Sequence, residues 1–235
     1  MKERLLRLIF PPRCAVCTEV LDLEERVGFL CRNCAKARPY IPQEVCPHCN
    51  GKTDTGGFCR ACLKEFAFES ACAAVPYETV RRAIHLFKFE GGKKLGEDLG
   101  RFLAEYLEER QRELLAQTDF MVCVPLYPKK EKRRGFNQAR LLCEGIAAQT
   151  GLLFRPEVLH RKRETAAQSS LDTPVQRRQN LQDAFVVTED LSGKRILLVD
   201  DIFTTGATCN ACAKELYRAG AEKVFVCCLS ATKRI

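Results

Sequence analysis

The 235-residue sequence predicts an α/β protein with a parallel sheet, preceded by a small cysteine-rich region. Apolar runs rich in branched residues, of which 194–199 is the clearest, indicate strands that are buried on both faces. Polar loops and amphipathic helical patterns follow two of these runs, which is the order of strand and helix in a parallel sheet. Four Cys-x-x-Cys pairs between residues 14 and 62 predict a separate region that metal ions hold together.

Chain length and cysteine content narrow the class of protein. A chain of this length has room for a small first domain, which we place at 1–68, and a full domain at 69–235. It contains fifteen cysteines, but we find no secretory signal and no apolar run of membrane-spanning length. We therefore expect a cytoplasmic protein without a membrane span, in which the cysteines are reduced or bind metal.

The cysteine pairs have the spacing of zinc knuckles, in which a tight turn places two sulfurs on one face. Two knuckles complete one tetrahedral site, so the sequence predicts about two Zn²⁺ ions. Sequential pairing of the knuckles is the simplest arrangement, and crossed pairing stays open. The ligands predicted by sequential pairing are Cys14, Cys17, Cys31 and Cys34 for one ion, and Cys46, Cys49, Cys59 and Cys62 for the other. Four cysteines leave no open position on the ion, which indicates structural sites, and His48 is interpreted as a bystander.

The full domain is expected to begin with a strand at 69–76. Two amphipathic helices follow, with apolar residues at helical spacing from Val80 to Leu107 and a glycine-containing break at 89–93. Lys88 lies at this break and is a candidate for an anion site, although a lone lysine is more often solvated.

A second buried strand is predicted at 120–126, followed by a basic loop that extends to residue 138 and a helix at 139–150. Between residues 121 and 180, twelve Lys and Arg outnumber five Asp and Glu, which favours binding of a polyphosphate or a nucleic acid. Because the carboxyl ends of parallel strands meet at one edge of a sheet, we expect the basic loop beside Asp200.

Shorter elements follow this unit. We expect a strand at 156–160, a mobile polar loop at 161–170, a helix at 174–181 and a strand at 185–187. The last strand of the sheet is predicted at 223–230.

The most informative stretch is 199–208, where two acidic residues end a strand and a turn rich in threonine leads into a helix at 209–219. Open α/β sheets bind ligands at this position. The turn suits a phosphate at the positive end of the helix dipole, whereas Asp200 and Asp201 repel phosphate and suit sugar hydroxyls. Together they predict a ribose phosphate. Cys209 and Cys212, one helical turn apart, are expected to be packed thiols rather than a redox pair.

This stretch resembles the phosphoribosyl diphosphate (PRPP) motif of type I phosphoribosyltransferases, in which two acidic residues precede a Thr-Thr-Gly-x-Thr turn. The whole chain resembles the ComF family of competence proteins, which place a double zinc ribbon before a type I phosphoribosyltransferase-like domain. The segment from Arg134 to Gln138, Arg-Gly-Phe-Asn-Gln, is similar to a signature of that family. Further residues similar to its signatures are Gln168, Arg177, Asn180 and Phe185.

The resemblance implies that Asp200 and Asp201 bind the ribose hydroxyls. It assigns the 5-phosphate to Thr204, Thr205, Gly206, Ala207 and Thr208. The loop at 126–138 would meet the diphosphate, and the loop at 161–172 would close over the substrate. The remaining substrate-binding residues that we predict are Lys88, Arg133, Arg134, Gly135, Asn137 and Gln168.

Displacement of diphosphate from ribose C1 needs Mg²⁺ and cations that stabilise the departing charge. The predicted catalytic residues are Asp200, Asp201, Arg161 and Arg163, with Arg133 and Arg134 as further cationic candidates. The acceptor of the phosphoribosyl group is not identified by the sequence.

Two functions from different classes therefore stay open. One is phosphoribosyl transfer to an unknown acceptor, and the other is a PRPP-sensing or single-stranded-DNA-binding module without turnover. The family resemblance implies a role in DNA uptake during natural transformation, with competence proteins such as a DNA-uptake helicase as partners. Phe136 is the main candidate for stacking on a base of single-stranded DNA.

Overall fold

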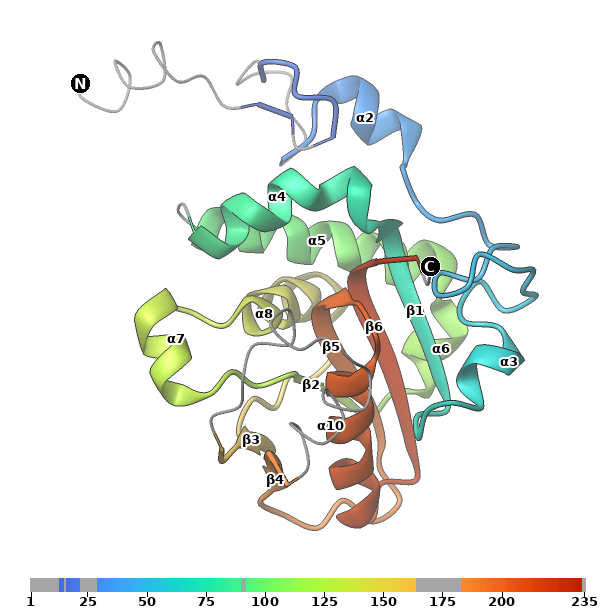
Figure 1. The fold of residues 1–235 in the computed structure, drawn as a ribbon, viewed down its shortest axis with the longest axis vertical. Helices are drawn as coiled ribbons and strands as arrows, with labels where there is room; N and C mark the ends of the chain where they lie inside the picture. Colours follow the sequence, from blue (N-terminus) through green and yellow to red (C-terminus); the bar gives the residue numbers. More distant parts are fainter. Residues whose placement is uncertain (1–12, 15, 22–28, 90–91, 164–182, 234–235) are drawn as a thin grey trace.

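The computed structural model describes residues 13–14, 16–21, 29–89, 92–163 and 183–233 (Figure 1). It has an α/β fold with a parallel sheet, as the sequence predicts. Gln168, Arg177, Asn180 and the helix expected at 174–181 lie outside the described residues. Among the helices of the described part, none is both long and apolar enough to cross a membrane.

Four parallel strands form the main sheet. In spatial order they are β1 (Ser70–Pro76), β6 (Lys223–Ala231), β5 (Arg195–Phe203) and β2 (Phe120–Cys123). Side chains alternate between the two faces along a strand. In β6, Cys227 belongs to the hydrophobic core on one face and Cys228 to the core on the other. Burial on both faces explains why these strands are continuous apolar runs in the sequence.

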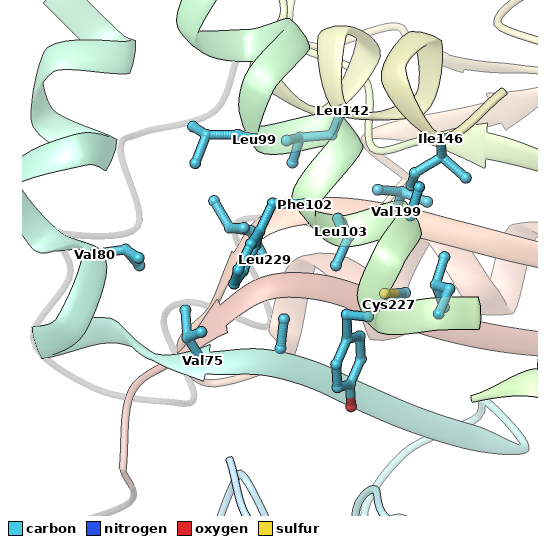
Figure 2. Packing of buried hydrophobic residues seen from close by; sticks show 14 of the residues in the cluster. Val75, Val80, Leu99, Phe102, Leu103, Leu142, Ile146, Val199, Cys227 and Leu229 are labelled. Carbon is cyan, nitrogen blue, oxygen red and sulfur yellow. The ribbon is translucent and has the colours of Figure 1, made fainter. Parts of the chain in front are cut away.

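Helices cover both faces of the sheet (Figure 1). One face carries α4 (Tyr77–Phe89), α5 (Gly92–Arg110) and α8 (Gln138–Thr150), and the other carries α10 (Ala207–Arg218). Figure 2 shows Leu103 of α5 and Leu142 of α8 in the same cluster as Val199 of β5. Helices α5 and α8 cross closely at two glycines, because a Cβ atom on Gly145 would lie 2.7 Å from the Cα of Gly100.

The cysteine-rich region closes the open edge of β1. The backbone N–H of Ile41 donates to the carbonyl of Ala74 at 2.9 Å, and that of Phe58 donates to the carbonyl of Ala71 at 2.8 Å. These bonds occupy edge groups that would otherwise be open to another strand. Because this region contributes residues to both hydrophobic cores, a division of the chain at residue 68 stays a prediction.

Several expected elements differ from the structure, and the strand expected at 120–126 ends earlier, as β2 at Cys123. Residues 128–134, expected within a loop, form helix α7 (Pro128–Arg134), which starts with proline at its first turn and ends at Gly135 in the left-handed conformation. The strand expected at 156–160 begins later, as β3 (Leu159–Arg161), because residues 156–157 form a turn. It pairs with β4 (Phe185–Val187) in a separate antiparallel sheet. Three short helices were not expected: α2 (Arg32–Ala37), α3 (Arg60–Leu63) and α6 (Arg112–Gln117).

Candidate functional site

The acidic pair belongs to the last residues of β5. This strand continues past the expected residue 199 to Phe203, because β6 pairs with it over the same length. The backbone N–H of Asp201 donates to Oδ1 of Asp200 at 2.8 Å, and the hydroxyl of Ser230 donates to the carbonyl of Asp201 at 3.4 Å. Both aspartates are half-buried, so the strand holds two carboxylates at the edge where the sheet meets solvent.

The turn after β5 opens helix α10. Gly206 precedes the first helical residue and has φ of +72°, a left-handed conformation that glycine adopts without strain. Because the first N–H groups of a helix have no partner within it, and Gly206 supplies no capping side chain, the opening turn of α10 has the arrangement that binds anions in other proteins. Thr204 is exposed, while Thr205 and Thr208 are half-buried beside these groups.

Two arginines from different elements interact electrostatically with the acidic pair. Arg134 ends α7, and burial lowers the pKa of its guanidinium while the charge of Asp201 opposes that shift. Arg161 ends β3, where burial again lowers the pKa and the charge of Asp200 opposes the shift. The guanidinium of Arg161 lies 5.4 Å from the centre of the Phe185 ring, which supports it from β4. The charges of Asp201 and Asp200 therefore act on Arg134 and Arg161, respectively.

The segment after α7 fixes the position of Arg134. Its Nη1 donates to Oε1 of Gln138 at 2.6 Å, and Gln138 is almost completely buried. Asn137 caps α8 by accepting from the N–H of Ala139 at 3.1 Å, and its side-chain amide donates to the carbonyl of Val124 at 3.0 Å. Sequence reasoning assigned Asn137 to the ligand, whereas here it ties the loop after β2 to the start of α8. A ligand contact of Asn137 stays a prediction.

A cavity of about 400 Å³ lies at the carboxyl end of β2. The loop after β2, the start of α7 and strand β3 form its walls, and Arg161, His160 and Glu131 line it. The negative charge of Asp200 influences the Cys123 thiol in the same wall, where burial raises the pKa to about 12. Cys123 lines the cavity and pairs with Val199, the residue before Asp200, so the cavity and the acidic pair lie at the same end of the sheet.

The other predicted ligand residues occupy more exposed positions. Arg133 precedes Arg134 and is exposed, and Arg163 is exposed just beyond β3. Gly135 ends α7, where its φ is +87°. Lys88 belongs to α4, but its side chain is not among those that the structure describes.

The eight predicted metal ligands form two groups. The first contains Cys14, Cys17, Cys31 and Cys34, and the second contains Cys46, Cys49, Cys59 and Cys62, each with its sulfurs within 4.8 Å of one another. The sulfurs of Cys17 and Cys31 are 3.7 Å apart, as are those of Cys49 and Cys59. Tetrahedral zinc with bonds of about 2.3 Å places two sulfurs about 3.8 Å apart, so both groups fit zinc in sequential pairing. Four thiolates fill the tetrahedron, which makes these sites structural.

The Cys209 and Cys212 thiols are packed in the core below the turn. Cys209 is 2% exposed and Cys212 is fully buried. Burial raises the pKa of Cys212 well above its ordinary value, which suppresses the reactive thiolate. The structure thus agrees with packed thiols rather than a redox pair.

Comparisons with known proteins agree with both halves of this description. Residues 5–74 match the double zinc ribbon domain, and residues 134–234 match the phosphoribosyl transferase domain. DNA utilization protein YhgH of Escherichia coli O157:H7 is 32% identical over 229 residues, covering 96% of this chain and 99% of that protein. Competence protein ComFC of Streptococcus pneumoniae is 33% identical over 212 residues, covering 88% of this chain and 90% of that protein. The chain belongs to the ComF family.

The ComF chain has a weaker likeness to solved structures. Glutamine PRPP amidotransferase from B. subtilis superposes with a TM-score of 0.41 at 20% identity, covering 63% of this chain and 30% of that one. The family membership rests on the full-length relatives.

Proposed function

We propose that this ComF protein binds magnesium-PRPP at the carboxyl ends of β5 and β2, and that binding serves a role in DNA uptake or utilization. One observation carries the proposal. The acidic pair ends β5 immediately before the turn that opens α10, and its charges act on Arg134 of α7 and on Arg161 of β3, which lines the neighbouring cavity. A cation pair, an acidic pair and a helix amino terminus together match the three chemical parts of PRPP.

Each part of the ligand is assigned by charge. The N–H groups and hydroxyls from Thr204 to Thr208 would hold the 5-phosphate. Asp200 and Asp201 would accept hydrogen bonds from the ribose hydroxyls, which a phosphate cannot offer. The diphosphate would extend toward the cavity lined by Arg161, where cations offset its charge.

Magnesium fits this arrangement, because it prefers oxygen ligands and is usually held by substrate phosphates together with one or two carboxylates. It would neutralise charge on the diphosphate and favour its departure. The protein's own contribution is to orient the ribose through the aspartates and to stabilise the leaving diphosphate through Arg134 and Arg161.

Phosphoribosyl transfer is the reaction that this arrangement supports. The bond between ribose C1 and the diphosphate oxygen breaks with both electrons leaving on oxygen, and the acceptor forms a new bond to C1 and loses a proton. The alternative is that PRPP binding acts as a signal without turnover.

The role in DNA uptake rests on the names of the relatives, which are DNA utilization and competence proteins. Helix α7 supports contact with single-stranded DNA, because Lys129, Lys132 and Arg133 are exposed on it. The partners that we propose are therefore PRPP, single-stranded DNA and other competence proteins.

The deciding experiment is to incubate the zinc-loaded protein with PRPP and magnesium, with and without bases or oligonucleotides, and to measure released diphosphate. Release that depends on an added acceptor and is lost in Arg134→Ala supports transfer. Calorimetric binding of PRPP without any release supports the sensing alternative. The proposal is wrong if the folded protein shows neither release nor binding.

A further inference from the structure

Four rings lie between the second cysteine group and the turn after β5: His48, Phe58, Phe66 and Phe203. We call them the aromatic wedge. His48 stacks on Phe58 with ring centres 5.4 Å apart and planes within 2°, and Phe58 meets Phe203 edge-on at 4.7 Å. Phe66 meets Phe203 edge-on at 5.6 Å. Phe58 and Phe203 are 1% exposed and His48 is 4% exposed, so these three rings are packed as in a core, while Phe66 is half-buried.

The wedge is attached to the metal ligands through the chain. His48 lies within the Cys46–Cys49 knuckle, and Phe58 is the residue before Cys59. The imidazole of His48 also meets Phe203 edge-on at 5.4 Å. A movement of either knuckle therefore moves a ring that touches the end of β5.

The other side of the wedge supports the turn itself. A Cβ atom on Gly206 would lie 2.3 Å from Cζ of Phe203 and 2.6 Å from Cε1 of Phe66. The backbone of the turn thus rests directly on two rings. Only glycine allows this approach at a residue that also has positive φ.

A hydrogen bond makes a second connection at the same place. The backbone N–H of Ala67, the residue after Phe66, donates to Oδ1 of Asn210 at 2.7 Å. Asn210 is in the first turn of α10, where its own N–H donates to the carbonyl of Gly206 at 2.8 Å. The ring contacts and this hydrogen bond together fix the first turn of α10 to residues 66–67, which follow the second cysteine group in the chain.

We propose that His48, Phe58 and Phe66 are positioning residues for the turn from Thr204 to Thr208, and that zinc at the second cysteine group sets the affinity of this turn for a sugar phosphate. The proposal rests on the proposed function, which assigns the 5-phosphate to this turn. Zinc fixes both knuckles, and a turn that is already ordered loses less conformational entropy when it binds. Without that zinc, the rings lose their anchor and the N–H groups must be ordered by the ligand.

The test compares matched ligand variants of the full chain. Cys49→Ser and Cys17→Ser each replace one exposed thiolate, in the second and first groups respectively. Elemental analysis should give one zinc fewer in each. Calorimetry with ribose 5-phosphate should show about tenfold weaker binding or more for Cys49→Ser, comparable to the loss of one hydrogen bond to a charged group, and unchanged binding for Cys17→Ser. Hydrogen exchange of the 203–210 amides should rise in Cys49→Ser alone.

A second variant keeps both zinc groups intact. Phe66→Leu should weaken ribose 5-phosphate binding and leave magnesium diphosphate binding unchanged, because the diphosphate is assigned to the arginine side of the site. Phe102→Leu removes a buried ring from the core on the other face of the sheet and should change the binding of neither ligand. General damage to the fold would not separate the two ligands in this way.

The outcomes distinguish the two proposals. If the wild type binds neither ribose 5-phosphate nor PRPP, the proposed function and this inference are both wrong. If the wild type binds and both Cys49→Ser and Phe66→Leu keep its affinity, the inference alone is wrong. If Cys49→Ser does not fold, the binding of ribose 5-phosphate and of magnesium diphosphate to Phe66→Leu still tests the inference.

Discussion

The two zinc groups have the same four-cysteine ligand set but rest on different parts of the sheet domain. The first group is packed against α5, where the ring of Phe102 lies 5.4 Å from that of Phe29 and 5.2 Å from that of Tyr40. Arg38 adds ion pairs with Glu105 and Glu109 on the exposed side of α5. The second group is packed against the turn after β5 through the aromatic wedge.

This difference in packing shows that the same four-cysteine ligand set supports two different parts of the protein. At the first group, aromatic pairs contribute about 0.5–1.5 kcal/mol each beyond area burial, whereas an exposed ion pair contributes about 0–1 kcal/mol, so the rings dominate the attachment to α5. That attachment stabilises a helix that carries no predicted ligand residue. At the second group, the same kind of ring contact ends at the predicted phosphate turn. We therefore expect loss of the first zinc to affect stability alone, and loss of the second to affect stability and binding.

Removal of zinc should change the stability of the protein more than any of the substitutions below. Protein purified without chelator should contain about two zinc ions per chain, and each structural zinc contributes on the order of 10 kcal/mol to the folding of so small a region. Elemental analysis and thermal unfolding with and without chelator measure both quantities. A zinc content near zero in well-folded protein would remove the basis of the comparison.

Replacing both Asp200 and Asp201 with Asn should give the next largest effect, which is a loss of affinity for PRPP. A hydrogen bond to a charged group contributes roughly 1.5–3 kcal/mol, so PRPP binding should weaken by about 3 kcal/mol or more, over a hundredfold. Reduced repulsion of the phosphates opposes this loss. Thr205→Val should also weaken binding, through a lost hydroxyl.

The control for the aspartate variant is its zinc content, which should stay at two because neither carboxylate is a zinc ligand. Calorimetry with PRPP and with ribose 5-phosphate should show the same dependence on the aspartates. Wild-type affinity in the double variant would mean that the end of β5 is only a structural joint.

Gly206→Ala should destabilise the protein, because the added methyl group would collide with the rings of Phe203 and Phe66 in the aromatic wedge. Positive φ costs an alanine roughly 1–2 kcal/mol, and overpacking against rings adds about 1–3 kcal/mol. Gly193→Ala is the matched control, because its φ is +70° and nothing lies within 4 Å of an added Cβ. The free energy of unfolding in urea should therefore fall by about 2 kcal/mol more for Gly206→Ala. An equal decrease in the free energy of unfolding for both variants would show that the rings move aside without an energetic penalty.

Local patterns explain how much of this arrangement could be predicted. Cysteine spacing, apolar runs and the acidic pair before a Thr/Gly turn each depend on neighbouring residues, and the structure has two groups of four cysteines and a parallel sheet, as expected. Helix α7 was missed because its residues are almost all charged and show no apolar face, although Pro128 and Gly135 are recognisable start and stop signals.

The aromatic wedge could not be predicted for a different reason. His48 and Phe203 meet only because β5 and the second knuckle pack together, and no spacing in the sequence records a contact between distant segments. His48 is a bystander to the metal, as expected, but its ring contributes to the support of the turn. Asn137 has a structural role that the sequence analysis did not name: it caps α8, a role for which an Asn before a helix is a known signal, and its predicted ligand contact stays a prediction.

The smallest expected effect is on the salt dependence of single-stranded DNA binding, which tests whether DNA lies along α7 or on the first cysteine group. Each phosphate contact adds roughly 0.7 to the log–log salt slope of single-stranded DNA binding. Replacing Arg133 and Arg134 with Ala should therefore flatten the slope by one to two contacts if DNA lies along α7. The matched variant replaces Arg32 and Lys36, which line a cavity of about 410 Å³ between the first zinc region and α5. Titrations of a labelled oligonucleotide at several salt concentrations would measure both. A slope that changes only in the second variant would place DNA on the first zinc region, and the two zinc groups would then divide DNA and sugar phosphate between them.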